Sequence, residues 1–321
     1  MTSGRRKDSG PSGGCRLYFF QAVFPGGGRV KSKKFVCLIL IPVFLHILIF
    51  MLIPILGSGV ISFMDYNPLR EQNLFVGLDN YVKLLGDGVY WKALTNTLVF
   101  VVVTVTFNIL LSLTLAALIS QFKSNKTRSF FRMITFLPCI APLVASSVVW
   151  GRSIYPTSSG LLNLIITKLG GSAVNWLGDA SYLMVSVVIF TLWADIGYNT
   201  ILFSAGMDGI PVDLYEAGCL DGTGRWRQFW RITLPLLRRT FVFVLLMTLI
   251  SYFQMFAQFN VLALKNGPQN SGLVLTSYIY KTAFEYKDMG YASAISMTLF
   301  VIILIIALIQ QKLGKVDWVI L

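Results

Sequence analysis

Few side chains in this sequence could take part in acid–base, nucleophilic or metal chemistry. His46 is the only histidine among 321 residues, although zinc sites are usually built from histidine and cysteine together. The cysteines are scattered along the chain, at Cys15, Cys37, Cys139 and Cys219. No nucleophile can be paired with a base, and no GxxxxGKS or GxxxxGKT phosphate loop occurs. The sequence therefore predicts no covalent catalysis, no nucleotide hydrolysis, and no metal or cofactor bound by this chain.

The composition is typical of a membrane protein. Apolar residues make up 55% of the chain and charged residues only 13%, whereas about 25% of a soluble domain is charged. A helix needs about 20 apolar residues to cross a bilayer. The segments that qualify are Phe35–Leu56, Thr97–Ser120, Met133–Trp150, Leu183–Met207, Thr240–Leu264 and Tyr291–Gln310. We expect an all-α polytopic membrane protein with six transmembrane helices, and short interfacial helices at 76–85 and 90–97.

The distribution of positive charge predicts the orientation. With the N-terminus inside, the cytoplasmic stretches are 1–34, 121–132, 208–239 and 311–321, and they hold 19 of the 27 Lys and Arg residues. Cytoplasmic loops of membrane proteins carry such an excess. We therefore predict that both termini are cytoplasmic. The net charge of +13 reflects this asymmetry and does not indicate a nucleic-acid partner.

One carboxylate, Asp195, lies within a predicted span. A charged side chain inside a membrane is costly and often functional. Proton- or sodium-coupled transporters usually need several such groups, and Asp195 stands alone beside Trp193 and Tyr198. A structural role, near a helix end or bonded to a neighbouring helix, is equally compatible with the sequence.

The segment between the fourth and fifth spans has the pattern of a helix, a turn and a second helix. It covers residues 215–240 and reads YEAGCLDGTGRWRQFWRITLPLLRRT. Glycine accepts the positive φ that ends a helix, so Gly222 and Gly224 predict the break, Thr223 caps the second helix, and Pro235 ends it. Such a segment could dock on another protein or lie on lipid headgroups through its arginines. The residue pattern alone does not separate these alternatives.

This segment resembles the EAA loop of permeases from ABC importers, whose form is EAAxxDGA followed by IxLP. The matching residues are Glu216, Ala217, Gly218, Asp221, Gly222, Ile232, Leu234 and Pro235. The chain departs from the family form at Gly218 and Thr223, where alanine is usual. In the family, the loop is a coupling helix that sits in a cleft of the ATP-binding subunit, and the resemblance implies the same role here.

The resemblance extends over roughly residues 35–310. It includes FVGLDNYVKLL at 75–85, FLPCIAPLVASSVVW at 136–150 and NWLGDASYLMVSVVIFTLWADIGYNT at 175–200. It points to the carbohydrate-uptake branch, and to its larger permease of the maltose or glycerol-phosphate type. The resemblance implies a type I importer core in a bacterial inner membrane. It also implies these partners: a second homologous permease, two ATP-binding subunits that hold ATP and Mg, an extracytoplasmic solute-binding protein, a carbohydrate, and membrane lipid.

A sugar pathway needs hydrogen-bonding groups and flat apolar faces. On the fifth span, Ser251, Gln254 or Met255, and Gln258 recur at three or four residues and would share one face of a continuous helix. By resemblance to the maltose-type permease, Gly197 and Thr200 join Ser251, Met255 and Gln258 at the sugar site, and Tyr198 lies beside them. The alternative is that these polar groups only bond neighbouring helices.

Small residues at Ser112, Ala116 and Ser120 predict a close helix contact, within the chain or with a partner.

We divide the chain into a basic tail at 1–34, a first helix and outer loop at 35–92, a permease core at 93–310 that contains the loop 208–239, and a tail at 311–321. The competing interpretation is a secondary transporter or facilitator for a small polar solute. A membrane enzyme or structural scaffold is disfavoured because no catalytic constellation is visible.

Overall fold

The computed structural model describes residues 33–70 and 73–313. The predicted basic tail therefore lies almost wholly outside the described residues. The described residues fall into two units, which divide between Gly57 and Ser58. The first unit holds α2 (Lys33–Ile47), a π-helical turn (Leu48–Leu52) and the start of α3 (Ile53–Ile61).

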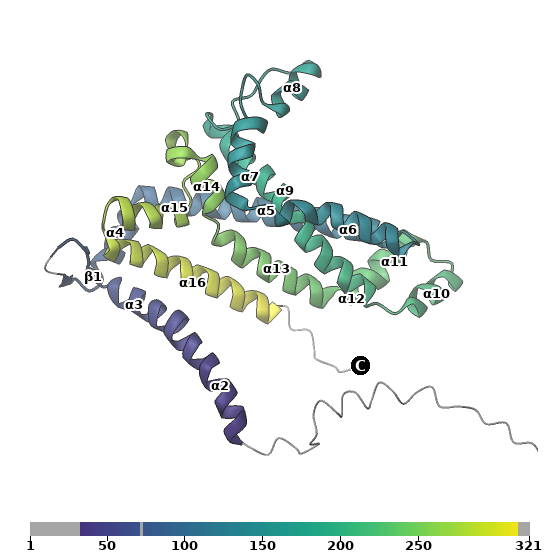
Figure 1. Ribbon diagram of the computed structural model, residues 1–321, viewed down its shortest axis with the longest axis horizontal. Helices are drawn as coiled ribbons and strands as arrows, with labels where there is room; N and C mark the ends of the chain where they lie inside the picture. The colour runs from purple at the N-terminus through teal and green to yellow at the C-terminus, as the bar shows by residue number, and fades with distance from the viewer. Residues whose placement is uncertain (1–32, 71–72, 314–321) are drawn as a thin grey trace, which may run out of the picture. The chain divides into compact units, whose positions relative to one another are not determined.

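The second unit is a bundle of long helices with shorter helices at its ends (Figure 1). Two short strands, β1 (Met64–Asp65) and β2 (Leu74–Phe75), form an antiparallel pair after α3. The helices that follow are α4 (Asp79–Gly86), α5 (Gly88–Ser120), α6 (Asn125–Ile140), α7 (Leu143–Val149), α8 (Leu161–Lys168), α9 (Ala180–Asp208), α10 (Val212–Leu220), α11 (Arg225–Gln228), α12 (Leu234–Leu236), α13 (Arg238–Phe253), α14 (Ala257–Leu262), α15 (Leu275–Tyr280) and α16 (Met289–Leu313).

Five described helices are long and apolar enough to span a bilayer. They are Leu40–Ile61, Gly88–Ser120, Ala180–Asp208, Arg238–Leu262 and Met289–Lys312. Each coincides with a predicted span. The second begins at Gly88 because the residues predicted as a separate interfacial helix at 90–97 are the first turns of α5.

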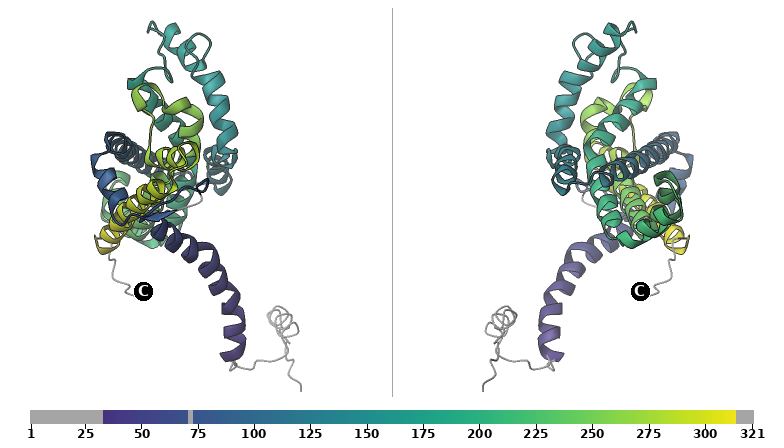
Figure 2. Two further views of the ribbon diagram at one scale, coloured as in Figure 1. Left: turned by 90° about the vertical axis from the view of Figure 1, so that its left-hand side faces the viewer. Right: turned by 90° about the vertical axis from the view of Figure 1, so that its right-hand side faces the viewer.

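The third predicted span is bent rather than straight. Asn125–Ile140 and Leu143–Ile154 meet at 87°, and Figures 1 and 2 show α7 and α8 projecting away from the long helices. The cause is Pro142, because a residue before proline is driven out of the helical region. Ala141 is accordingly extended, at φ −68° and ψ 137°. Counted as one bent segment, the two helices bring the described candidate spans to six, the number predicted from the sequence.

The core of the second unit forms where α5 lies along α9. Helix α9 also packs on α6, and α13 contacts α5, α9 and α16. Ser112 and Ala116 are fully buried, and the Ser112 hydroxyl reaches the Ile196 carbonyl at 3.3 Å. The small-residue face predicted on α5 is therefore used within the chain, because small side chains let two helix backbones approach.

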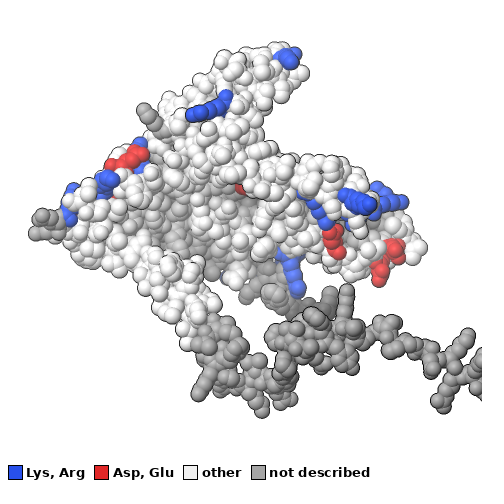
Figure 3. All heavy atoms as spheres, in the orientation of Figure 1, with Lys and Arg blue, Asp and Glu red and all other residues white. Residues whose placement is uncertain are grey.

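Charged side chains lie mainly toward the ends of this unit. Figure 3 shows Lys and Arg over the α4 end, over the end that carries α6 and α11, and on the upper projection of α7 and α8, with few charged side chains between them. A wide uncharged surface suits the hydrocarbon of a bilayer, where a charge costs about 3 kcal/mol or more. This distribution agrees with the spans assigned from helix length.

A carboxylate joins the starts of α5 and α16 to α15, three elements that lie together in Figure 1. Asp87 caps α5, since its Oδ1 accepts from the Val89 N–H at 2.8 Å. Its Oδ2 accepts from the hydroxyls of Tyr278 and Tyr291, each at 2.6 Å. Burial acts to raise the pKa of Asp87, but the tyrosine and backbone hydrogen bonds outweigh it, so the pKa is lowered.

We predict that Asp87→Asn lowers thermal stability at neutral pH. Asparagine still caps the helix, but the two tyrosines lose a charged acceptor. Hydrogen bonds to charged groups contribute about 1.5–3 kcal/mol, and the loss here should be smaller because Asp87 is partly exposed to solvent. A carboxylate with a lowered pKa stabilises the fold above its ordinary pKa of about 3.9, and this contribution is lost as the pH falls through the folded-state pKa. The difference in melting temperature should therefore be full at pH 7 and shrink below about pH 4.

The matched control is Asp179→Asn. Asp179 caps α9 through the Ser181 N–H at 2.8 Å, and no tyrosine hydroxyl bonds to it within the described residues. This variant should melt like the wild type. Equal melting of Asp87→Asn and wild type at pH 7 would contradict the role assigned to the carboxylate.

Candidate functional site

The loop between α9 and α13 folds as two helical arms joined by a tight turn. Helix α10 is the first arm. The second arm runs from α11 through a π-helical turn at Phe229–Thr233 to α12. Gly222 makes the turn, with φ at +71°, where a side chain bearing a Cβ is strained. The break predicted at this glycine is confirmed.

Two predicted details of the loop are wrong. Thr223 does not cap the second arm. Gly224 holds that position without a side-chain bond, while the Thr223 hydroxyl turns back and donates to the Gly218 carbonyl at 2.5 Å. Pro235 does not itself end the second arm, which runs one residue further and ends at Leu236.

The two arms are fastened to each other by polar side chains. The hydroxyls of Tyr215 and Thr233 lie 2.9 Å apart. Gln228 is buried and donates toward the carbonyls of Tyr215 at 3.3 Å and Thr223 at 3.2 Å. These bonds cross the turn, so the loop behaves as one body rather than two independent helices.

The glycine at position 218 is explained by this packing. A Cβ built on Gly218 would stand 3.0 Å from the Thr223 hydroxyl, 3.2 Å from Ile232 and 3.3 Å from Gln228. Thr223 is larger than alanine and fills the space that a Cβ on residue 218 would need. The two departures from the usual loop pattern are therefore complementary.

The outer face of α10 is exposed and mixes apolar with acidic groups. Leu220 is 90% exposed, and Glu216, Ala217 and Asp221 are exposed beside it. Contiguous exposed apolar surface of this kind commonly marks an interaction site. Gly218 is the buried residue on this helix, so α10 presents nearly all of its surface outward.

The second candidate region lies where the fifth span is broken. Helix α13 ends at Phe253 and α14 begins at Ala257, so Gln254, Met255 and Phe256 are not helical. Non-helical backbone within a membrane is tolerated where protein buries it or where it lines a water-filled cavity. Transporters place such breaks at substrate sites.

The break separates the residues predicted to share one face of a continuous helix. Ser251 and Gln254 are exposed, and Met255 is half-buried. Gln258 lies beyond the break and is 1% exposed. Its Nε2 lies 2.8 Å from the Met255 sulfur, and its Oε1 has no hydrogen-bond partner within the described residues. The common face predicted from helical spacing is therefore not formed.

The three pathway residues predicted on α9 also differ in environment. Gly197 is buried, and a Cβ there would collide with the backbone of Thr135 and Phe136 on α6. Thr200 is fully buried and donates to the carbonyl of Ile196 at 2.7 Å. Tyr198, in contrast, is 50% exposed. Gly197 thus serves close packing of α6 on α9, and Tyr198 is the accessible member.

Sequence reasoning missed a buried polar network that joins α5, α9 and α13. Asn199 donates to the Asn108 side-chain oxygen at 2.6 Å and to the Thr248 hydroxyl at 3.0 Å. Asn108 in turn donates to the Tyr252 hydroxyl at 2.8 Å. The sequence did contain a signal for this network, namely Asn108 and Asn199 within apolar spans, because amides in such positions usually bond a neighbouring helix. The network fixes these three helices one turn from the break.

Asp195 lies on α9 next to this network. Its carboxylate is close enough to the Cys139 thiol and the Tyr252 hydroxyl to interact electrostatically with both. No Lys or Arg of the described residues pairs with it. Among all the residues that the structure describes, no three His, Cys, Asp or Glu side chains lie close enough together to hold a metal ion.

Comparison with known proteins identifies the family. The family described as "Binding-protein-dependent transport system inner membrane component" matches residues 108–315. This range includes α9, both arms of the loop and the broken fifth span. The chain therefore belongs to that family, and it is the permease component of an ABC transporter rather than an enzyme.

Relatives match over nearly the whole chain. The arabinooligosaccharides transport system permease protein AraP of Bacillus subtilis is 34% identical over 273 residues, which cover 85% of this chain and 86% of AraP. The trehalose/maltose transport system permease protein MalF of Thermococcus litoralis is 32% identical over 290 residues, covering 89% of this chain and 96% of MalF.

A solved structure supports the fold. The bacterial alginate ABC transporter, in complex with an alginate pentasaccharide-bound periplasmic protein, contains a chain that superposes with a TM-score of 0.78. The match covers 89% of this chain and 96% of that chain at 23% identity. The all-α fold expected from the sequence, a type I importer permease core, is therefore confirmed.

Proposed function

We propose that this chain forms, with a second permease, the pathway through which an ATP-driven importer moves a sugar or oligosaccharide into the cytoplasm. The relatives described above are named for oligosaccharide and disaccharide transport. The observation that carries the proposal is the rigid loop with its exposed α10, because a facilitator or secondary transporter has no need for such a docking element. ATP and Mg then belong to partner subunits, and a solute-binding protein delivers the sugar from outside.

The proposed orientation places the loop in the cytoplasm. The stretches 1–34, 121–132, 208–239 and 311–321 hold 19 of 27 Lys and Arg residues, which favours both termini inside. On this orientation α10 faces the ATP-binding subunits. Helix α8, in the outer loop that follows the third span, then faces the solute-binding protein.

Coupling follows from the rigidity of the loop. A movement of the ATP-binding subunit pushes α10, and the bonds among Tyr215, Gln228 and Thr233 pass that movement to the second arm. The second arm runs into α13 after Leu237, and α13 leads to the break in the fifth span. The proposed roles are docking for Glu216, Ala217 and Asp221, turning for Gly222, close packing for Gly218 and Ile232, and continuation into α13 for Leu234 and Pro235.

We predict that Gly222→Val abolishes most sugar uptake while the chain still inserts in the membrane. A β-branched residue at φ +71° is strained by about 1–2 kcal/mol or more, so the two arms lose their relative placement. Glu216→Lys, which reverses the charge on the exposed face of α10, should have a similar effect. In both variants, ATPase activity stimulated by the loaded binding protein should fall together with uptake.

The control is Gly224→Val. Gly224 has φ −72° and no atom within 4 Å of a Cβ built on it, so a side chain is accepted without strain. Uptake by this variant should match the wild type. Normal uptake by Gly222→Val and Glu216→Lys would exclude the coupling role and leave a loop that only lies on lipid.

We further propose that the accessible groups around the break line the sugar pathway. Ser251 and Gln254 supply hydrogen-bonding groups, and Tyr198 supplies an aromatic face on which a sugar ring can stack. Met255 and Gln258 adjoin them, and the unpartnered Oε1 of Gln258 is available if the break rearranges. Gly197 and Thr200 act by packing, because neither has accessible surface in this conformation.

Two substitutions test the pathway. Gln254→Leu and Tyr198→Ala should each lower uptake by the assembled transporter several-fold, while ATPase stimulation by the loaded binding protein persists. This pattern differs from that of the loop variants, in which both activities fall. Thr200→Val keeps the volume and removes a hydroxyl that only bonds its own helix, so its uptake should be unchanged. Unaltered uptake by Gln254→Leu and Tyr198→Ala would show that these side chains do not face the sugar.

A further inference from the structure

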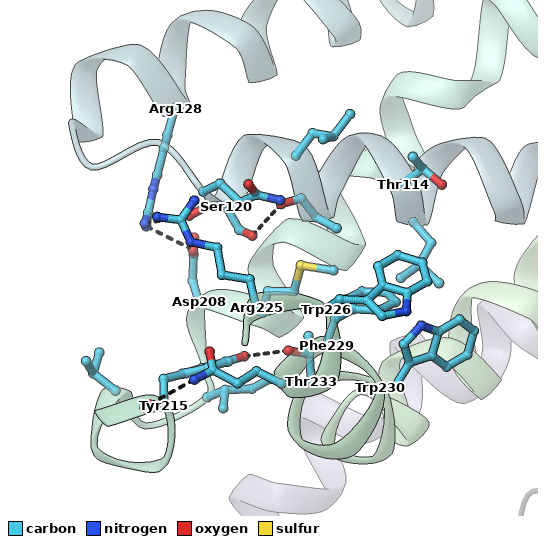
Figure 4. Close-up of a pocket in the computed structure, with 18 of the residues that line it drawn as sticks. Thr114, Ser120, Arg128, Asp208, Tyr215, Arg225, Trp226, Phe229, Trp230 and Thr233 are labelled. Atoms are coloured by element: carbon cyan, nitrogen blue, oxygen red, sulfur yellow. Dashed lines mark hydrogen bonds and ion pairs between the residues drawn. The ribbon is translucent and has the colours of Figure 1, made fainter. Parts of the chain in front are cut away.

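A cavity of about 1000 Å³ lies between the loop and the ends of α5, α6 and α9. Figure 4 shows the side chains around it, with Arg128, Asp208 and Arg225 at one end and Trp226 and Trp230 at the other. The cavity belongs neither to the exposed face of α10 nor to the break in the fifth span. It requires an explanation of its own.

One wall of the cavity is an apolar stripe on α5. The residues are Leu110, Leu113, Ala117 and Leu118, with Thr114 among them. Their spacing is that of a single helix face, and the face extends for about 12 Å along the span at 1.5 Å per residue. The stripe lies toward the C-terminal end of this span, which ends at Ser120.

The opposite wall carries large aromatic rings. Trp226 is 74% exposed and Trp230 is 51% exposed, and the two rings meet edge to face with centroids 5.8 Å apart. Tryptophan prefers the boundary between hydrocarbon and headgroups. Exposed rings at the end of a span thus suit contact with lipid chains near their headgroups.

The rim of the cavity is positively charged. Arg128 and Arg132 reach Asp208 at 3.8 Å and 2.7 Å, and Arg225 also lines the cavity. Three arginines against one aspartate leave two positive charges. In addition, Arg132 Nε is buried and has no acceptor within the described residues. Arg128 also donates to the carbonyls of Phe122 and Ser120, so the exposed guanidinium of Arg225 is the main donor left for an anion with several oxygens.

We propose that this cavity binds one anionic phospholipid, with its phosphate at the arginine rim and an acyl chain along the stripe on α5. A net positive rim selects a negative headgroup, since basic pockets between transmembrane helices bind such lipids. The apolar wall on α5 suits an acyl chain attached to that headgroup, so a free phosphate ion would fill only the charged part of the site. Because the lipid contacts α11 and the π-helical turn after it, its occupancy supports the second arm of the loop.

The test uses the purified full-length chain, incubated with equal amounts of phosphatidylglycerol and phosphatidylcholine and analysed by native mass spectrometry. The wild type should retain phosphatidylglycerol in preference. Arg225→Gln should lower that retention about fivefold, because a basic side chain near an anionic lipid contributes about 1 kcal/mol. Arg225→Lys, which keeps the charge, should retain the lipid.

Arg227→Gln is the matched control, because Arg227 lies on the same short helix and does not line the cavity. It should bind like the wild type. Trp226→Ala combined with Trp230→Ala should lower retention of both lipids, and excess inorganic phosphate should displace neither. Thermal unfolding of each variant checks that it is folded.

Four results would overturn the proposal. Equal retention of the two lipids by the wild type would exclude a selective site. Equal losses in Arg225→Gln and Arg227→Gln would indicate diffuse attraction to the surface. Displacement by inorganic phosphate would indicate an ion site. Lipid bound by the isolated chain but absent from the assembled transporter would show that a protein partner fills the cavity.

Discussion

A bilayer offers no water to a backbone amide or carbonyl, and the architecture of this chain follows from that constraint. The spans are long helices, since a helix satisfies its own backbone. The two departures, the 87° bend between α6 and α7 and the break between Phe253 and Ala257, are therefore costly unless protein or a water-filled pathway surrounds them. The Asn108–Asn199 network holds α5, α9 and α13 next to that break. A transport pathway that opens alternately to the two sides of the membrane needs rigidly packed helices beside an interrupted one.

The loop solves a different problem, which is to pass a movement from outside the membrane into a packed bundle. A flexible connection would absorb the movement. Here Gly222 turns the chain sharply, and Tyr215, Thr233 and Gln228 tie the arms together. The phospholipid that we place behind α11 would stiffen the same body from its membrane side. The proposed docking, coupling and lipid contacts thus all act on one rigid element.

Spans and loop were predictable because each depends on local rules. Twenty apolar residues specify a span wherever they occur, and a glycine at a helix end specifies a turn. The sugar-facing set was harder, because helical spacing assumes a continuous helix, and nothing in the run SYFQMFAQFN, which lacks Pro and Gly, announces the break at Gln254. The bend in the third span was predictable from Pro142, because the residue before a proline is driven out of the helical region. The role of Asp87 depends on partners distant in sequence, Tyr278 and Tyr291, which spacing cannot reveal.

The central claim is that α10 docks on an ATP-binding subunit, and cross-linking from its most exposed side chain tests it most directly. A photo-activatable benzophenone residue in place of Leu220, which is 90% exposed, should cross-link to the ATP-binding subunit in membranes that hold the assembled transporter. The same residue in place of Leu169, which is 83% exposed after α8, should not reach that subunit. A cross-link from position 220 to lipid alone, or equal cross-linking from both positions, would contradict the account.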